Sequence, residues 1–358
     1  MSDLAALAAR YVSIPSVSGD EAAICNDIEA TLRAAPHLEV TRIGDNLVAR
    51  TTGTAPTRLV LAGHLDTVPG ELGHRAVDGD GVLRGLGACD MKGSLAAMVA
   101  LGLEGPHRGS EATYVFYARE EVARADSGLL ELLAVAPELL AGDAAVLCEP
   151  TSCVVEAGCQ GVVRLDVVLA GQRAHTARPW RGRNAIHRLA PLLAAVAAYV
   201  PRSVEIDGAT YTEQLQVVRV DGGVSANVVP DRASVTLNHR VAPDRSTDDA
   251  VAALLELLGP HLEDTDAVEV TDAADPAAPT LSHPALARLV ELSGGPPRAK
   301  LGYTDVATFS AIGVPAANFG AGDPELAHHA GELVEVREIE RCREVLAALL
   351  ESPLSPVG

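Results

Sequence analysis

Aromatic side chains are scarce in this sequence: its 358 residues include one Trp, six Tyr and three Phe, or 3% of the chain. Exposed aromatic rings are what single-stranded nucleic acids stack on, so the composition disfavours a base-stacking surface. Basic residues are also few, with 28 Lys and Arg against 48 Asp and Glu, which gives a formal net charge of −20. Nucleic acids and anionic membranes both attract clusters of Lys and Arg, and the charge argues against either as a partner.

Long apolar runs and paired cysteines are missing as well. The longest apolar stretch, roughly 189–200, is too short for a membrane span, which needs about 20 residues. The first residues, MSDLAALAARY, do not have the basic region and apolar core of a signal peptide. The six cysteines form no CxxC pair, and Cys148, Cys153 and Cys159 fit no common zinc-finger spacing. We therefore expect reduced, mostly buried thiols and a cytoplasmic protein.

Hydrophobic residues make up 48% of the chain, enough for a sizeable core, and the length favours two domains. Apolar runs at 58–62, 113–118 and 144–148 predict buried strands, and the spacing over 91–103 predicts a helix. Strands that alternate with helices predict an α/β layer with a largely parallel sheet. Ser18 lies three residues before Glu21, a capping-box spacing that predicts a helix from about Asp20.

The pattern changes between residues 161 and 273. Here the predicted order is β-α-β-β-α-β, the split arrangement of a ferredoxin-like α+β layer. An Ala-, Pro- and Asp-rich segment follows at 272–279 and is typical of a linker. We therefore expect an α/β protein with a mixed, twisted-sheet domain of residues 1–160 and 274–358, into which a ferredoxin-like domain of residues 161–273 is inserted.

Histidines and carboxylates gather in five short segments, several of which follow predicted strands. These residues are His64 and Asp66, then Asp90, then Glu120 and Glu121, then Glu149, and finally His328, His329 and Glu332. Ligand sites of open α/β sheets lie at the carboxyl ends of strands. Mixed nitrogen and oxygen donors suit zinc, cobalt or manganese, and a shared carboxylate would give a dinuclear site. Taken singly, each residue has an ordinary interpretation: a structural His, a solvated Glu pair or an N-cap Asp.

The ordered set HLDTVP, GLGACDMKG, REE, CEPT and a C-terminal HxxxE resembles the M20 family of zinc aminoacylases and peptidases, over nearly the whole chain. The resemblance implies two zinc ions per subunit, with cobalt possible at one site. It implies these ligands: His64 and Glu149 for one ion, Glu121 and His328 for the other, and Asp90 between them. Glu120 would be the general base for the metal-bridged water, and Asp66 would hydrogen-bond His64 and fix its tautomer.

Two details qualify this set. The family pattern places a Glu four residues after the ligand, which selects His328 because Glu332 follows at that distance; His329 remains an alternative. The family often has Asp before the paired glutamates, whereas this chain has Arg119, which could alter the electrostatics around Glu120.

In the family, the inserted domain acts as a lid and dimerisation domain. The segment RAHTARP at 173–179 resembles the one whose His reaches the active site of a partner subunit, so His175 would donate a hydrogen bond to the oxyanion across a homodimer. A surface or core His is the alternative. Arg178 and Arg240 are candidates for substrate carboxylates, which guanidinium groups bind bidentately, although a surface ion pair is equally open for Arg178. Asn227, Gly302 and Thr304 match substrate-binding positions.

Four further segments, at 157–161, 222–230, 302–305 and 318–324, resemble those of family members that act on a small acidic substrate. These members hydrolyse the amide of N-succinyl-L,L-2,6-diaminopimelate to succinate and L,L-diaminopimelate, a precursor of lysine and peptidoglycan. Deacetylation of acetylornithine and cleavage of aminoacyl dipeptides are the alternatives within the family. A non-catalytic metal-binding relative is the alternative outside it. Nucleotide binding is disfavoured, since Gly85-x-Gly87 lacks the third glycine of the dinucleotide fingerprint.

Overall fold

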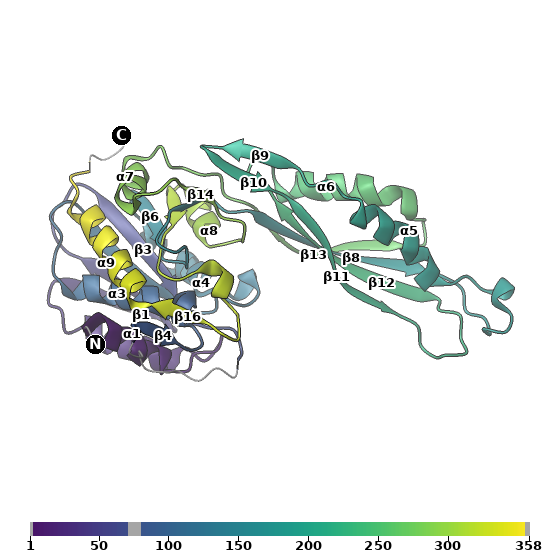
Figure 1. The fold of residues 1–358 in the computed structure, drawn as a ribbon, viewed down its shortest axis with the longest axis horizontal. Helices are drawn as coiled ribbons and strands as arrows, with labels where there is room; N and C mark the ends of the chain where they lie inside the picture. The colour runs from purple at the N-terminus through teal and green to yellow at the C-terminus, as the bar shows by residue number, and fades with distance from the viewer. Residues whose placement is uncertain (1–2, 71–79, 355–358) are drawn as a thin grey trace. The chain divides into compact units, whose positions relative to one another are not determined.

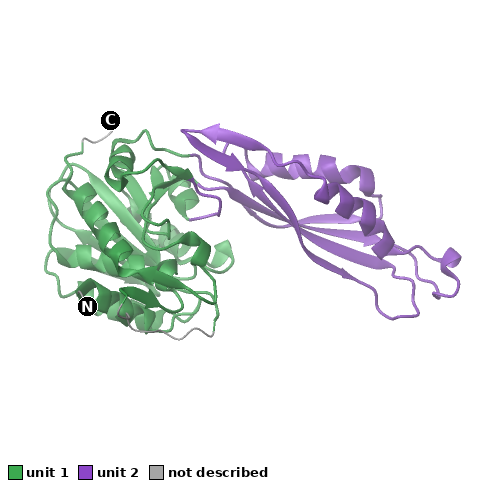
Figure 2. Cartoon of the chain, viewed as in Figure 1, with its two compact units in different colours: residues 1–158, 279–298, 305–358 green, residues 159–278, 299–304 purple. Residues whose placement is uncertain are grey.

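The computed structural model describes residues 3–70 and 80–354, which divide into two compact units (Figure 2). Unit 1 consists of residues 1–158, 279–298 and 305–358, and unit 2 of residues 159–278 and 299–304. The sequence predicted boundaries nearby, at 160/161 and 273/274. It did not predict that the short segment 299–304 belongs with the inserted unit.

An eight-stranded mixed sheet forms the centre of unit 1 (Figure 1). In sheet order its strands are β1 (Leu38–Ile43), β2 (Asn46–Thr51), β5 (Glu111–Tyr117), β3 (Arg58–His64), β6 (Ala144–Leu147), β15 (Ala316–Asn318), β7 (Glu156–Ala157) and β14 (Arg298–Ala299). β3 runs parallel to β5 and β6, and β15 runs parallel to β6. The β1–β2, β2–β5 and β15–β7 pairs are antiparallel, so the predicted parallel order holds only in the middle of the sheet.

Helices pack against this sheet and enclose the main core. They are α1 (Asp3–Val12), α2 (Ala22–Leu32), α3 (Gly93–Leu103), α4 (Gly128–Val135), α7 (Pro284–Ser293), α8 (Val306–Ala311) and α9 (Val336–Glu351). α3 is apolar around nearly its whole circumference, as expected of a central helix between sheet and outer helices. It lies so close to β3 that a Cβ atom at Gly63 would meet Leu95 Cδ2 at 2.9 Å. Glycine at this position therefore lets α3 approach the end of β3, where His64 lies.

A two-stranded ladder joins distant parts of unit 1. β4 (Val82–Arg84) pairs antiparallel with β16 (Leu333–Glu335). The glycine-rich segment after β4 thus lies beside the histidine-containing segment before β16. This pairing brings Asp90 and His328 into one neighbourhood although more than 200 residues separate them in the sequence.

Unit 2 has a four-stranded antiparallel sheet in the order β11-β12-β8-β13. Its elements are β8 (Gly161–Ala170), α5 (Ala185–Ala197), β9 (Ser203–Ile206), β10 (Ala209–Thr212), β11 (Gln214–Gly222), β12 (Arg232–Val241), α6 (Thr247–Leu258) and β13 (Ala267–Ala274). Buried residues alternate along β12, and α5 and α6 cover its buried face. The predicted βαββαβ order is confirmed. The β9–β10 hairpin was not predicted, although Asp207-Gly208 at its turn has positive φ at both residues, as a two-residue hairpin requires.

A buried carboxylate holds unit 2 together near this hairpin. Glu213, whose side chain is 0% exposed, accepts hydrogen bonds from Arg245 at 2.9 and 2.7 Å and from the Ala242 amide at 3.1 Å. The Tyr199 hydroxyl donates to it at 3.3 Å. Burial alone would raise the pKa of Glu213, but contacts with His239, Ala242 and Arg245 lower it to about 2. Glu213 therefore ties the ends of α5, β11, β12 and α6 into one network.

Replacing this carboxylate should destabilise the protein in a pH-dependent way. Its folded pKa lies below the ordinary value of 4.5, so it stabilises the fold above that pH, and this contribution is lost as the pH falls towards 2. We expect Glu213→Gln to lower the free energy of unfolding at pH 7 by roughly 3–5 kcal/mol, because Arg245 loses its buried partner. The deficit should shrink between pH 4.5 and 2 in urea titrations. The exposed Glu205→Gln is the control, and equal stability of the two variants would contradict this role.

Candidate metal centre

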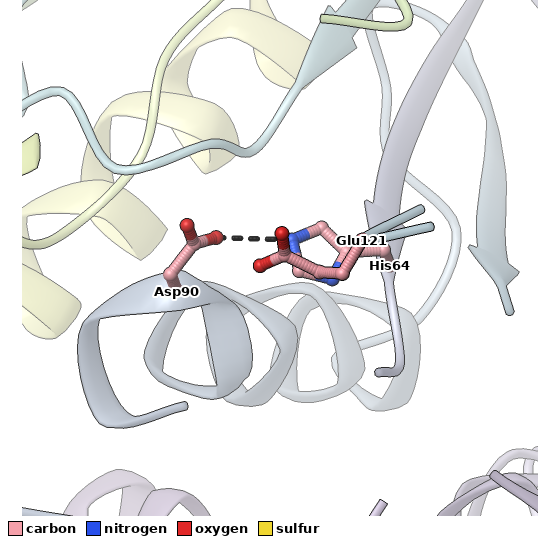
Figure 3. Close-up of side chains that lie close together, drawn as sticks. All are labelled: His64, Asp90 and Glu121. Atoms are coloured by element: carbon pink, nitrogen blue, oxygen red, sulfur yellow. Dashed lines mark hydrogen bonds and ion pairs between the residues drawn. The ribbon is translucent and has the colours of Figure 1, made fainter. Parts of the chain in front are cut away.

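Three of the sequence-predicted ligands lie together in unit 1 (Figure 3). His64 ends β3, Asp90 lies in the loop before α3, and Glu121 follows β5. One ligand atom from each of the three lies within 4.8 Å of the others. His64 Nε2 is 2.9 Å from Asp90 Oδ1. Because β3 and β5 are parallel neighbours, their carboxyl ends present His64 and Glu121 at the same edge of the sheet.

His328 faces the same group from the C-terminal segment. Its Nε2 is 2.7 Å from Glu121 Oε1 and 3.6 Å from Asp90 Oδ2. Its backbone is in the left-handed region, with φ of 61°, which a residue with a Cβ seldom adopts. The ring of His329 instead accepts the amide hydrogen of Gly331, at 3.1 Å from Nδ1. Of the two neighbouring histidines, His328 is the one whose side chain meets the carboxylates.

Glu120 and Glu149 add negative charge beside these residues. Glu149 follows β6 and is buried, and it interacts electrostatically with both His64 and Glu120. Burial raises the pKa of the Glu120 carboxyl well above its usual range, and the carboxylates of Glu149, Asp305 and Glu121 raise it further, against the effect of His64. So many carboxylates in a water-poor place repel one another unless positive charge balances them.

Both histidines respond to this excess of negative charge. Burial alone would lower the pKa of His64, but hydrogen bonds to Asp66 and Asp90 raise it well above its ordinary value. The hydrogen bond to Glu121 likewise raises the pKa of His328. The cluster thus favours a cation at its centre. Its imidazole and carboxylate donors match the preferences of zinc, cobalt and manganese, so the residues fit a divalent metal ion.

Asp66 contacts His64 and also has a role that the sequence did not predict. His64 Nδ1 lies 3.0 Å from the Asp66 backbone oxygen, and 3.5 Å from the Asp66 carboxylate. The two carboxylate oxygens each accept a backbone amide hydrogen at 3.0 Å, one from Glu120 and one from Glu121. Although burial alone would raise the pKa of Asp66, its hydrogen bonds lower it well below its usual range. Asp66 therefore orients the glutamate pair as well as the histidine.

The predicted capping box of Ser18 and Glu21 is wrong. α2 begins at Ala22 without a side-chain cap, and the Ser18 hydroxyl donates instead to Asp66 at 2.6 Å. Glu21 Oε1 accepts the amide hydrogens of Gly19 and Arg119 at 2.8 and 3.0 Å. Both side chains form hydrogen bonds beside the candidate metal centre, because the loop before α2 crosses the ends of β3 and β5. Spacing along the chain alone could not distinguish this use from a helix cap.

Arg119, the departure from the family pattern, has its own partner. Its guanidinium contacts Glu131 at 2.7 Å and donates to the Asp126 backbone oxygen at 2.7 Å. Its backbone has a φ of 59°, so the chain turns sharply at the end of β5 just before the glutamate pair. The positive charge of Arg119 is thus balanced by Glu131 of α4.

The other predicted residues belong to unit 2. His175 and Asn227 come together, since Val228 pairs with His175 and the Asn227 backbone oxygen accepts the Thr176 amide hydrogen at 3.1 Å. Both side chains, and that of Arg178, are exposed. Arg240 lies on β12 opposite Val162, at the start of β8, whereas His175 follows the end of β8. Gly302 and Thr304 lie in the segment 299–304, and Thr304 is buried.

The fold and this centre define a family. The model of peptidase family M20/M25/M40 matches residues 60–352, and the chain belongs to that family. Members of the family are metal-dependent, and the cluster of His64, Asp90 and Glu121 is a possible metal-binding group in this chain. Among the described residues, no helix combines the length and apolar character needed to cross a membrane.

Two bacterial proteins are similar to this chain over nearly its whole length. A protein of Mycobacterium tuberculosis (strain H37Rv), provisionally named a succinyl-diaminopimelate desuccinylase, is 46% identical over 348 residues, covering 96% of this chain and 97% of its own. The succinyl-diaminopimelate desuccinylase of Corynebacterium glutamicum is 42% identical over 366 residues, covering 99% of this chain and 97% of its own.

Solved structures share the fold at lower identity. A tripeptidase of Staphylococcus aureus has a TM-score of 0.80 at 20% identity and covers 97% of both chains. A Bacillus subtilis protein described as a dinuclear metal-binding M20 peptidase has a TM-score of 0.70 at 15% identity, covering 97% of this chain and 96% of its own.

Substituting the two neighbouring histidines separately should distinguish their roles. We expect His328→Ala to weaken zinc binding about tenfold or more, a loss of about 1.4 kcal/mol or more, because His328 faces Glu121 and Asp90. His329→Ala should bind zinc as the unsubstituted protein does. Both side chains are exposed, so neither change should unfold the chain. Competition with a chromogenic chelator measures the affinities, and a greater loss in His329→Ala would reverse the assignment.

Proposed function

We propose that this protein is a dizinc hydrolase that cleaves N-succinyl-L,L-2,6-diaminopimelate to succinate and L,L-diaminopimelate. The observation that carries this proposal is the near full-length similarity to proteins named succinyl-diaminopimelate desuccinylase. The cluster of His64, Asp90 and Glu121 supports it by supplying a possible metal-binding group. The reaction would serve lysine and peptidoglycan precursor synthesis. The six free, buried cysteines favour the cytoplasm, where thiols stay reduced.

Five residues would hold two metal ions. His64 and Glu149 would bind one ion, Glu121 and His328 the other, and Asp90 would contact both. Zinc is the proposed occupant of both positions, with cobalt able to fill one. When bound, the two ions would polarise the scissile carbonyl and stabilise the negative charge that develops on it.

Glu120 would move the proton in this reaction. Its carboxylate would accept a proton from the attacking water and return it to the amide nitrogen of the leaving diaminopimelate. The backbone of Glu120 is fixed by Asp66, which accepts its amide hydrogen at 3.0 Å. Asp66 would thus act through the glutamate pair and through His64. A fixed general base needs no reorganisation when the transition state forms, which is what efficient proton transfer requires.

Unit 2 would supply the contacts to the substrate. Arg178 and Arg240 would bind its carboxylates, because a chain of net charge −20 needs local guanidinium groups to hold an anion. Burial lowers the pKa of Arg240, and the charge of Arg164 lowers it further, so an anion at this place would relieve a repulsion between two cations. Asn227, Gly302 and Thr304 would line the substrate site, where the buried Thr304 hydroxyl has no hydrogen-bond partner among the residues that the structure describes.

His175 would act on the substrate bound by a second copy of the chain. His175 and Arg240 lie at opposite ends of β8, and the ten residues of that strand span about 30 Å. A small substrate cannot reach both residues of one chain. Arg178 and Asn227 lie beside His175 and belong to the same end. In a homodimer, these three residues of one subunit would reach the site of the other, where His175 would donate a hydrogen bond to the oxyanion. The edge strands β11 and β13 leave backbone groups for pairing between subunits.

A substrate comparison tests the proposed function. Zinc-loaded protein should hydrolyse N-succinyl-L,L-diaminopimelate and lose that activity when a chelator removes the metal. N-acetylornithine and a dipeptide serve as the competing substrates. Exclusive turnover of either of these would contradict the proposed substrate and leave the metal-dependent chemistry in place.

Removal of the proposed base should separate chemistry from metal binding. We expect Glu120→Gln to lower kcat by about 10²–10⁴-fold, since the loss of a general base costs a factor of that order. Zinc content should remain that of the unsubstituted protein, because Glu120 is not a proposed ligand. The exposed Glu138→Gln is the control for a change of charge. Full activity of Glu120→Gln would remove Glu120 from the mechanism.

A further inference from the structure

The loop that carries Asp90 does not fix its own conformation. Gly87 has a φ of 77°, and Asp90 and Met91 have non-helical φ/ψ values of −117°/95° and −133°/32° inside the short turn Ala88–Lys92. No regular helical or strand pattern holds the backbone of this turn at Asp90. Other parts of the protein must therefore set the direction of the Asp90 side chain.

The carboxylate of Glu332 holds the backbone of this loop in place. Its side chain is buried, with 2% of the residue exposed. One carboxylate oxygen accepts the amide hydrogen of Gly87 at 3.0 Å. The other oxygen accepts those of Cys89 at 2.9 Å and Asp90 at 3.0 Å. Hydrogen bonds to a charged acceptor are stronger than neutral ones, so one carboxylate fixes three amides of the loop.

The same residue is connected to the histidine segment. The Glu332 amide donates to the His329 backbone oxygen at 3.0 Å, which closes the turn that follows His328. Its backbone oxygen accepts the amide hydrogen of Gly85 at 3.2 Å, next to the β4–β16 ladder. Glu332 thus lies at the junction of the two segments that present Asp90 and His328.

A buried cation balances this carboxylate. Lys92 is 2% exposed, and its ammonium group donates to the Ile14 backbone oxygen at 2.7 Å. It interacts electrostatically with Glu332 and with Asp66. These two carboxylates are the ones that orient the loops of the centre through backbone amides. Lys92 therefore places a positive charge near both carboxylates.

We infer that Glu332 is a positioning residue that sets the geometry of Asp90 and His328 for binding of the metal ions. This inference rests on the proposed ligand roles of Asp90 and His328. Glu332 makes its contacts through backbone amides, and it acts on the metal centre only through them. Without its carboxylate, three buried amides would lose their acceptor and the Asp90 loop would relax.

Cobalt binding tests this inference without reference to turnover. Cobalt titrations, followed by visible absorption and by chelator competition, report the affinity and the ligand geometry of each site. We expect Glu332→Gln to bind cobalt about 10–100-fold more weakly at one or both sites, the usual effect of losing a group that orients a ligand. Its absorption bands should shift, because the amide NH2 of Gln would face a backbone N–H. Glu325→Gln, exposed in the same segment, should bind as the unsubstituted protein does.

Glu332→Asp separates position from charge. Asp keeps the negative charge but is one methylene shorter and cannot hold all three amides. If position matters, Glu332→Asp also binds cobalt more weakly than the unsubstituted protein. Circular dichroism of the metal-free protein shows whether Glu332→Gln folds. If it does not fold, the cobalt affinity of Glu332→Asp tests the inference in its place.

The outcomes are distinct. Affinities and spectra of both Glu332 variants that match the unsubstituted protein would overturn the inference. Failure of the unsubstituted protein itself to bind two cobalt ions would instead overturn the proposed metal centre.

Discussion

The structure of unit 1 depends on how several carboxylates are accommodated at one edge of a sheet. Asp90, Glu120, Glu121 and Glu149 come from separate segments and meet around His64, with most of their surface hidden from water. Like charges at such a place repel one another strongly. The nearby carboxylates raise the pKa values of His64 and His328, and they therefore favour positive charge at this place. A bound divalent metal ion would satisfy the same requirement.

Three other carboxylates hold the loops of the centre in place by accepting backbone amide hydrogens. Asp66 fixes the glutamate pair, Glu21 fixes the residue before that pair, and Glu332 fixes the loop of Asp90. Each of these carboxylates joins segments that are far apart in the sequence. The parallel pairing of β3 with β5 and the β4–β16 ladder bring those segments within reach. The fold and the centre therefore stabilise each other, because the same hydrogen bonds serve both.

Local patterns were sufficient to predict much of this architecture. The strands ending at His64 and before Glu120 were marked by apolar and β-branched runs, and the βαββαβ order of unit 2 by its alternation. The roles of Ser18 and Glu21 were predicted wrongly. A capping-box spacing gives no information on partners that lie 48 and 98 residues further along the chain. The role of Glu332 could not be derived, since it depends on a ladder between residues 82–84 and 333–335. In the sequence it appeared only as a residue four positions after His328.

We propose that this cluster of carboxylates and histidines binds two metal ions. Anomalous diffraction at the zinc edge, from crystals grown with zinc, tests it most directly. We expect two peaks that share Asp90, one beside His64 and Glu149 and the other beside Glu121 and His328. A single peak, or peaks bound by other residues, would contradict it.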